Sequence, residues 1–217
     1  MREGPTRRVV LGQGLGLVGA LAVGGRAPAA QDQRPPGLRG GAELYGGVNI
    51  AGGEFGPLLG KHWHQYVYPE PQNIDYYAGL GFRLIRVPFK WERLQPVLGQ
   101  ALAPEDLKLL TASVEHALSR DLRVVLDPHN YAKRALAEDG WKQTHMIGSA
   151  RVPNSAFADF WARLADAFRN DPRVLFGLMN EPTDIAPAGW LQATNEAISA
   201  IRAHGAGNLV ALPHPSC

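Results

Sequence analysis

Short apolar runs alternate with amphipathic segments from residue 45 onwards, and this alternation constrains the fold more than any other feature of the chain. Strands that alternate with helices pair in parallel through right-handed crossovers. The sequence therefore predicts an α/β fold, either an open doubly wound sheet or a (β/α) barrel. The apolar runs expected to be strands are residues 45–50, 82–87, 122–126, 174–179 and 208–212.

Four helices are predicted between these runs. The first covers residues 72–80, and the fourth lies around residues 190–201. Pro104 suits the first position of the second helix, and Ser155 is expected to be the N-cap of the third. The third helix has the clearest apolar stripe: Phe157, Phe160, Trp161, Leu164, Ala165 and Phe168.

The residues that follow the strands favour the barrel. No Gly-x-Gly-x-x-Gly turn follows the first strand, and no Gly-Lys-Ser/Thr loop occurs in the sequence. Pro88 is expected to end the second strand and Asp127-Pro128 the third. Polar residues lie at these ends, which is where barrels carry their active sites.

Polar side chains from three strand ends are expected to converge on one face. Arg86 lies near the end of the second strand, and His129 and Asn130 follow the third. Asn180 and Glu181 follow the fourth, and Pro182 then stops the strand. An arginine, a histidine, amides and a carboxylate in one cleft could bind and protonate a hydroxyl-rich substrate.

Each of these residues also has a simpler interpretation. Partial burial would favour the neutral carboxyl of Glu181, which suits a general acid, but Glu181 could instead cap the next helix. Arg86 could pair with a carboxylate at the edge of the core, His129 could be structural, and Asn130 is a common loop former. The joint placement of these residues supports a site more than any one of them does.

Aromatic and histidine residues in the loops suggest two further kinds of site. Trp63 and Tyr131 could stack on the apolar faces of sugars, or they could pack beneath long loops. His62 and His64 could chelate a metal in a metal-dependent hydrolase. That spacing is weak and no closed Cys/His set exists, so no metal or other cofactor is expected.

The N-terminal residues are predicted to direct export. Residues 1–30 contain Arg7-Arg8, an apolar stretch and a small-residue cleavage pattern, which is typical of a twin-arginine signal. An uncleaved membrane anchor is the alternative. Residues 31–41 are expected to be flexible, and residues 42–217 to form the catalytic domain. We therefore expect a secreted or periplasmic protein without stable membrane association after cleavage.

The charge distribution gives no indication of nucleic-acid binding. The whole chain has a formal net charge of +2. Residues 1–30 hold four arginines and one glutamate, a net of +3, which leaves −1 for the rest. The basic balance therefore belongs to the expected export signal.

Several segments resemble glycoside hydrolase family 5, in particular the secreted endo-β-1,4-glucanases or cellulases. The resemblance covers roughly residues 45–213, and Asn-Glu-Pro directly after a strand is its most specific part. The segments that carry it are Gly47-Val48-Asn49-Ile50-Ala51-Gly52, Phe82-Arg83-Leu84-Ile85-Arg86-Val87-Pro88, Asp127-Pro128-His129-Asn130-Tyr131, Phe176-Gly177-Leu178-Met179-Asn180-Glu181-Pro182 and Ala200-Ile201-Arg202-Ala203-His204-Gly205-Ala206.

The resemblance implies a (β/α)₈ TIM barrel that cleaves β-1,4-glucan with retention. Glu181 would be the general acid/base, and Asn180 would bond the sugar 2-hydroxyl. His129 would contact the substrate, and Arg86 would orient and support the nucleophile. The implied partner is a β-glucan polysaccharide or oligosaccharide.

A retaining enzyme needs a second carboxylate about 5 Å from the first. The resemblance implies that this nucleophile follows the seventh strand, whereas the expected strands here number five. We therefore expect about five of eight βα units and a C-terminally truncated domain without its nucleophile. Glu54, Asp184 and Glu196 are poor substitutes. The alternative function is a catalytically dead, carbohydrate-binding remnant.

Overall fold

The computed structural model describes residues 46–215. The chain divides into Met1–Glu43 and Leu44–Cys217, and every described residue lies in the second unit. The predicted export signal and the predicted flexible segment, residues 31–41, lie outside the described residues. Within residues 46–215, no helix is both long and apolar enough to cross a bilayer.

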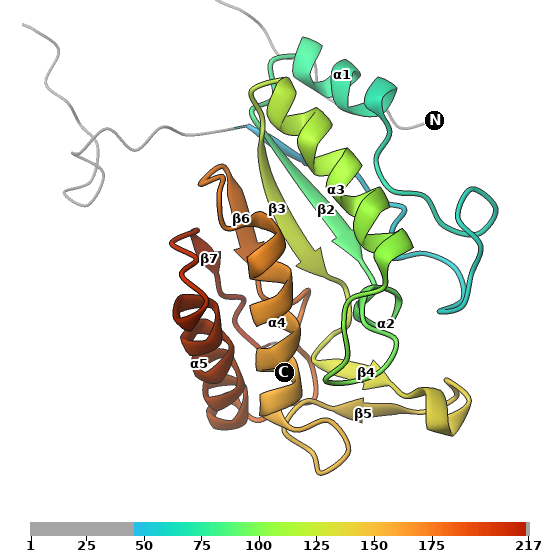
Figure 1. The fold of residues 1–217 in the computed structure, drawn as a ribbon, viewed down its shortest axis with the longest axis vertical. Coiled ribbons are helices and arrows are strands. Elements are labelled where there is room, and N and C mark those ends of the chain that lie inside the picture. Colours follow the sequence, from blue (N-terminus) through green and yellow to red (C-terminus); the bar gives the residue numbers. More distant parts are fainter. Residues whose placement is uncertain (1–45, 216–217) are drawn as a thin grey trace, which may run out of the picture. The chain divides into compact units, whose positions relative to one another are not determined.

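A five-stranded parallel sheet forms the centre of this unit (Figure 1). Neighbouring strands follow the order of the chain without a reversal, so every right-handed crossover places its helix on the same face. A doubly wound sheet would reverse direction and carry helices on both faces. The strands are, in order, β1 Gly47–Asn49, β2 Leu84–Phe89, β3 Arg123–Pro128, β6 Val174–Gly177 and β7 Val210–Ala211.

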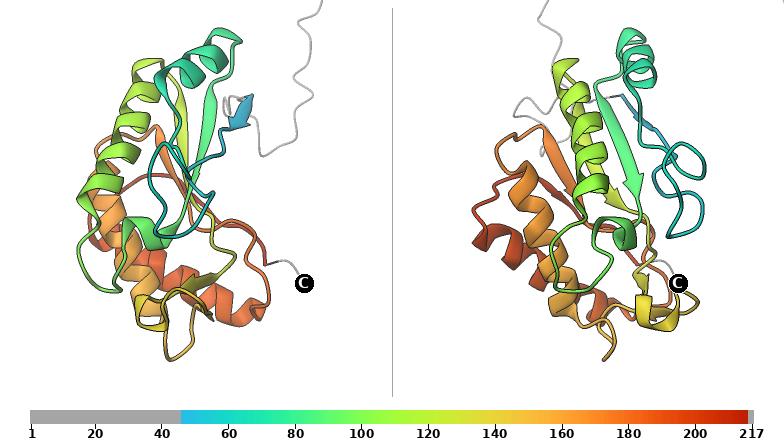
Figure 2. Two further views of the ribbon diagram at one scale, coloured as in Figure 1. Left: turned by 90° about the vertical axis from the view of Figure 1, so that its right-hand side faces the viewer. Right: turned by 45° about the vertical axis from the view of Figure 1, so that its right-hand side comes forward.

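The four predicted helices are present, and α3, α4 and α5 lie on one side of the sheet (Figure 2). Their bounds are α1 Pro71–Gly79, α3 Pro104–Ser119, α4 Asn154–Phe168 and α5 Pro187–Ala203. The expectation that Ser155 caps α4 is wrong, because Pro153 is the N-cap and Ser155 lies in the first turn. All six residues of the predicted α4 stripe are buried.

Short elements between β2 and α4 were not predicted. Helix α2 covers Trp91–Leu94, and a hairpin pairs β4 Lys133–Ala135 with β5 Thr144–Met146 around the 3₁₀ turn η2, Ala137–Asp139. Elements of three or four residues are too short to show a period in the sequence.

Pro88 does not end β2, contrary to the prediction. The Arg86 carbonyl accepts from the backbone N–H of Ile50, on the side of β1. The Phe89 carbonyl accepts from the backbone N–H of His129, on the side of β3. Successive residues of a parallel strand bond in alternate directions, so Pro88 faces the side of β1. Strand β1 has already ended at Asn49, so Pro88, which lacks an N–H, loses no hydrogen bond to either neighbouring strand. Strand β3 also extends past its predicted end and includes Asp127 and Pro128.

The two faces of the sheet differ in burial. The residues that face the helices are fully buried: Ile85, Val87, Val124, Leu126, Val174 and Phe176. The alternate residues on the opposite face are only half-buried, among them Leu84, Val125 and Leu175. In a closed barrel this second face would be the interior. In the described part of the chain it is partly open.

We expect an isolated polypeptide of these 217 residues to self-associate. Strands β1 and β7 are the edges of the sheet, and Leu209 and Leu212 beside β7 are 59% and 50% exposed. Unpaired edges and exposed apolar residues are templates for association. Sedimentation velocity at increasing protein concentration would show rising oligomer content. A monomer with a sharp and reversible melt would contradict this expectation.

Ion pairs that join the helices and loops predict a loss of stability in acid. Asp75 on α1 accepts from His116 of α3 and from Arg120, the C-cap residue of α3, which lowers the pKa of Asp75. Hydrogen bonds from His145 and Arg173 likewise lower the pKa values of Asp139 and Asp171. A carboxylate whose folded-state pKa lies below its unfolded value of about 3.9 stabilises the folded protein above that pH. This contribution to the free energy of unfolding is lost as the pH falls through the folded-state pKa.

Melting temperature should therefore fall between about pH 5 and pH 2, and Asp75→Asn should make this fall shallower. Glu115→Gln is the control, because Glu115 is exposed on α3 and has no hydrogen-bond or ion-pair partner among residues 46–215. Equal acid sensitivity of Asp75→Asn and Glu115→Gln would show that the α1–α3 pairs do not contribute.

Candidate active site

Three strand ends meet at Arg86. Its Nη2 donates to Asp127 Oδ2 at 2.8 Å and also to Asn180 Oδ1. Its Nη1 lies 3.4 Å from Asn49 Oδ1, at the end of β1. The backbone N–H of Asn180 donates to the carbonyl of Pro128 at 2.9 Å, which fixes the loop after β6 to the end of β3. The predicted convergence of these strand ends is therefore present.

Asp127 connects His129 to the same network. The Asp127 side chain is 4% exposed, and its Oδ2 also lies 3.1 Å from His129 Nδ1. From the end of β2, Lys90 Nζ donates to the His129 carbonyl at 2.7 Å. Burial lowers the pKa of Lys90. Strands β2 and β3 thus hold His129 through both its backbone and its ring.

Glu181 lines a cavity of about 350 Å³ together with Arg86, Asp127 and Asn180. The cavity is completed by residues of β3, β6 and β7 and of the segments that follow β6 and β7: Val125, Gly177, Met179, Ala211, Leu212 and Pro213. The backbone of Glu181 has a φ of 36°, in the left-handed region that a non-glycine residue rarely adopts. Such strain clusters at ligand-binding sites.

The expectation of partial burial and the alternative of a helix cap are both wrong for Glu181. Its side chain is exposed rather than partly buried, because the open inner face leaves one side of the cavity uncovered. It also does not cap the next helix, since α5 begins at Pro187 with Ala186 as N-cap. The simpler interpretation of Glu181 as a helix cap is thereby excluded.

The structure separates the other predicted binding residues. Tyr131 is 37% exposed, and its ring lies 5.3 Å from the His129 ring at an interplanar angle of 85°. Trp63 is 63% exposed in the loop between β1 and α1, packs against His62, and does not line the cavity at Glu181. Tyr131 therefore belongs beside the site, whereas Trp63 lies apart from its cavity.

Asn130 was predicted to bind substrate, but its amide is turned toward α2 and it does not line the cavity at Glu181. Its side chain is buried, with Oδ1 accepting from the Trp91 backbone at 2.9 Å and Nδ2 donating to Glu92 Oε2 at 2.6 Å. The oxygen and the nitrogen of the amide are thus both hydrogen-bonded to residues of α2. Glu92 in turn accepts from the Ala135 backbone at 2.8 Å, so Asn130 and Glu92 together connect α2 to the β4 hairpin.

Arg93 is a supporting residue that the sequence did not single out. Its guanidinium lies 4.0 Å above the Tyr66 ring and donates to backbone carbonyls of the loop after β1, among them Gly53 and Pro57. Asp106 accepts from the Tyr66 hydroxyl at 2.9 Å. Burial, and then this bond, raises the pKa of Tyr66 to about 12, and burial raises the pKa of Asp106. These contacts anchor the loop that carries Trp63.

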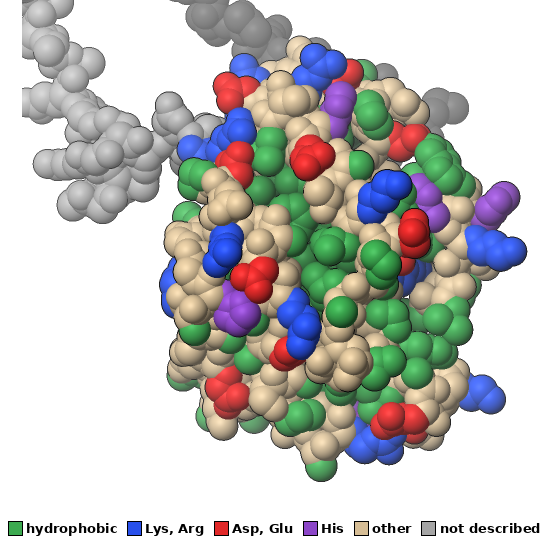
Figure 3. Space-filling model, in the orientation of Figure 1, with side chains coloured by type: hydrophobic (Ala, Val, Ile, Leu, Met, Phe, Trp, Pro, Cys, Tyr) green, Lys and Arg blue, Asp and Glu red, His purple; other side chains and the backbone are tan. Residues whose placement is uncertain are grey.

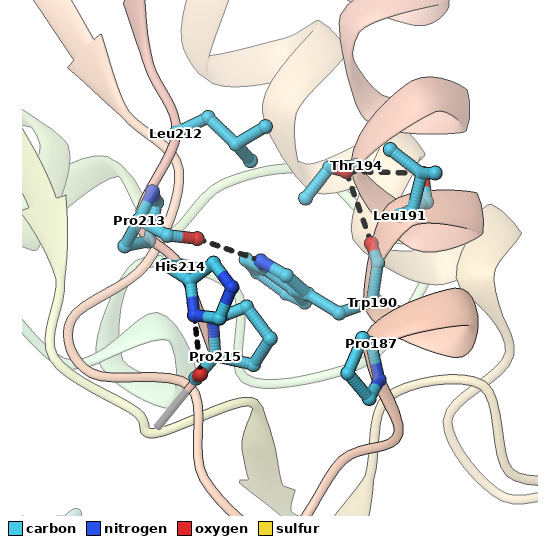
Figure 4. A pocket seen from close by; sticks show the side chains of 8 residues that line it. All are labelled: Pro187, Trp190, Leu191, Thr194, Leu212, Pro213, His214 and Pro215. Atoms are coloured by element: carbon cyan, nitrogen blue, oxygen red, sulfur yellow. Dashed lines mark hydrogen bonds between the residues drawn. The ribbon is translucent and has the colours of Figure 1, made fainter. Parts of the chain in front are cut away.

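A second cavity, of about 270 Å³, lies between α5 and the segment after β7 (Figure 4). Trp190 Nε1 donates to the Pro213 carbonyl at 2.9 Å across it. Prolines and leucines make up much of its lining, and no carboxylate lines it. It therefore lacks the groups that acid–base chemistry needs.

Metal-binding groups and surface charge give no second candidate. No cluster of three or more His, Cys, Asp or Glu side chains that could hold a metal occurs among residues 46–215. On the face drawn in Figure 3, positive and negative side chains are interspersed rather than gathered by sign. The cavity beside Arg86 and Glu181 is therefore the candidate active site.

Comparison with known proteins identifies the family. The family model for cellulase, glycosyl hydrolase family 5, matches residues 46–216. The chain belongs to this family. The predicted (β/α)₈ barrel class is thereby confirmed, and the described residues of this family 5 chain form five parallel strands of an incomplete barrel.

Similar relatives are endoglucanases. Endoglucanase 1 of Saitozyma flava is 34% identical over 193 residues, which cover 88% of this chain and 52% of that protein. The structure of XacCel5A in complex with cellopentaose is 40% identical, with a TM-score of 0.74 over 79% of this chain and 53% of that one. Pseudomonas stutzeri endoglucanase Cel5A in complex with cellobiose is 39% identical, with a TM-score of 0.65 over 72% and 46%. The family 5 chain thus spans about half the length of these relatives.

Proposed function

We propose that this family 5 chain contributes the acid/base half of an endo-β-1,4-glucanase active site. The observation that carries the proposal is the guanidinium of Arg86, which bonds both Asp127 and Asn180 beside Glu181 in one cavity. The active sites of barrels lie at this end of the strands. The complexes of XacCel5A with cellopentaose and of Cel5A with cellobiose support a β-1,4-glucan as the ligand.

In this proposal Glu181 protonates the departing glycosidic oxygen and later activates water, as in double displacement. Asn180 bonds the sugar 2-hydroxyl, while Arg86 and His129 contact the glucan. Tyr131 offers an exposed ring beside His129 for stacking, and Trp63 serves a more distant sugar unit. The side chain of Glu181 needs no rearrangement to reach a ligand, because it is already exposed in the cavity.

The nucleophile is proposed to come from outside the described residues. Asp127 is the other carboxylate lining the cavity, but it is buried and bonded to Arg86 and His129. Glu54 accepts from the Gly52 backbone at 2.7 Å, and Glu196 accepts from Asn154 at 3.1 Å. None of these three is free to attack an anomeric carbon.

The twin-arginine pattern supports export, so we also propose that the protein acts outside the cytoplasm on β-glucan. The competing proposal is a carbohydrate-binding remnant. It is favoured by one observation, that the cavity offers a single uncommitted carboxylate, Glu181, where retention needs two.

Binding and turnover distinguish the two proposals. A chimera would join residues 46–213 to the part of XacCel5A that follows the matched segment. If the chain is part of an enzyme, the chimera releases reducing sugar from cellopentaose, whereas the 217-residue chain alone binds it without release. Calorimetry with Asn180→Ala as control would measure that binding. A chimera that binds cellopentaose without turnover favours the remnant, and loss of all affinity contradicts both proposals.

A further inference from the structure

His129 is held from four directions. Its backbone N–H donates to the Phe89 carbonyl at 2.7 Å, and its own carbonyl accepts from Lys90 Nζ at 2.7 Å. The ring of Tyr131 stands nearly perpendicular to the imidazole, with 5.3 Å between the centroids. Ring nitrogen Nδ1 lies 3.1 Å from Asp127 Oδ2. Both the position and the rotation of the imidazole are therefore fixed.

The contact with Asp127 also determines where the ring carries its proton. Asp127 Oδ2 also accepts from Arg86 Nη2 at 2.8 Å, so the oxygen that faces His129 Nδ1 serves as a hydrogen-bond acceptor. The ring nitrogen that faces an accepting carboxylate oxygen must carry the hydrogen. In neutral His129 that nitrogen is Nδ1, and Nε2 then holds a lone pair.

We infer that Asp127 is a positioning residue that holds neutral His129 as the Nδ1–H tautomer. Nε2 has no hydrogen-bond partner among residues 46–215, so it is available as an acceptor. If the proposed function is correct, this acceptor receives a hydrogen bond from a glucan hydroxyl. Asp127 thus acts on the substrate through the ring it orients, without contacting the substrate itself.

Two other histidines in the chain provide internal references. His145 presents Nε2 to Asp139 Oδ2 at 2.5 Å, and His116 presents Nε2 to Asp75 Oδ1 at 2.7 Å. The same reasoning assigns the Nε2–H tautomer to both. His129 should therefore differ from His145 and His116 within a single sample.

Two-bond ¹H–¹⁵N correlation spectra of the ¹⁵N-labelled 217-residue chain would test the inference, at a pH well above the ordinary histidine pKa of about 6.5. His129→Gln identifies the signals of His129. We expect the Nδ1–H pattern for His129 and the Nε2–H pattern for His145. An Nε2–H pattern for His129 in the unsubstituted chain would overturn the inference, whatever the variants do.

Asp127→Ala and Asp139→Ala form a matched pair. Asp127→Ala should let His129 populate the Nε2–H form and leave His145 unchanged, and Asp139→Ala should affect His145 alone. Persistence of the Nδ1–H form in folded Asp127→Ala would show that Asp127 does not set the tautomer. If Asp127→Ala does not fold, the spectrum of the unsubstituted chain alone shows whether the tautomer assigned to His129 is correct.

Addition of cellopentaose separates this inference from the proposed function. A shift confined to Nε2 of His129 supports the acceptor role, and a shift confined to Nδ1 contradicts it. If cellopentaose does not bind, the proposed function fails while the tautomer assignment stands on the spectrum of the free protein.

Discussion

Glu181→Gln in the XacCel5A chimera is expected to lower kcat on cellopentaose by about 10²–10⁴-fold, the usual contribution of general acid–base catalysis. Glutamine keeps the size of the side chain but cannot donate a proton to the departing glycosidic oxygen. Because the Glu181 side chain is exposed and makes no hydrogen bond within residues 46–215, the exchange should leave the fold unchanged. Steady-state kinetics of reducing-sugar release would measure the effect.

Glu115→Gln is the matched control for this exchange, since Glu115 is an exposed carboxylate on α3 and does not line the cavity. Its kcat should remain within twofold of the unsubstituted chimera. An activated aryl cellobioside, whose leaving group needs no proton, should be cleaved by Glu181→Gln with a much smaller loss in the first step. Undiminished turnover of cellopentaose by Glu181→Gln would refute the acid/base assignment.

Arg86→Met is expected to destabilise the chain by about 3 kcal/mol, the low end of the range for removing one partner of a buried ion pair. The reason is that Asp127, with a side chain 4% exposed, loses the guanidinium that offsets its burial. The effect is not larger because His129 still faces the carboxylate, and because the Arg86 side chain is 31% exposed. Urea denaturation of both proteins would give the difference in the free energy of unfolding.

Arg83→Met is the control, because Arg83 is exposed just before β2 and, among residues 46–215, its guanidinium donates only to the carbonyl of its neighbour Phe82. Its effect should stay below about 0.5 kcal/mol, as for most surface substitutions. Adding Asp127→Asn to Arg86→Met should recover part of the loss, since the uncompensated charge is then gone. An Arg86→Met effect as small as that of Arg83→Met would contradict the network.

The parallel sheet and its helices could be predicted because their apolar residues repeat at the periods that burial imposes. The stripe from Phe157 to Phe168 is an example, since all its members are buried on α4. The placement of Asn180 and Glu181 was also predictable, because the sequence changes from apolar to polar residues where the strand ends. Arg86, three positions before the end of β2, followed from the same reasoning.

Side-chain partners were less predictable than positions. Asn130 follows β3 as expected, yet its amide turns toward Glu92, because α2 places a carboxylate there. Asp127 was recognised only as a polar residue at a strand end, whereas it joins Arg86 to His129. Arg93 gave no signal, because its acceptors are backbone carbonyls 36 to 40 residues away. Such pairings depend on which elements meet in the fold. Local periodicity in the sequence carries no information about that.

The most direct test of the central claim is a crystal structure of the Glu181→Gln chimera with cellopentaose. The proposed function predicts that the side chain at position 181 lies within hydrogen-bond distance of a glycosidic oxygen, with Asn180 contacting the 2-hydroxyl of the adjoining sugar. Cellopentaose bound away from the cavity that Arg86, Asn180 and position 181 line would contradict it.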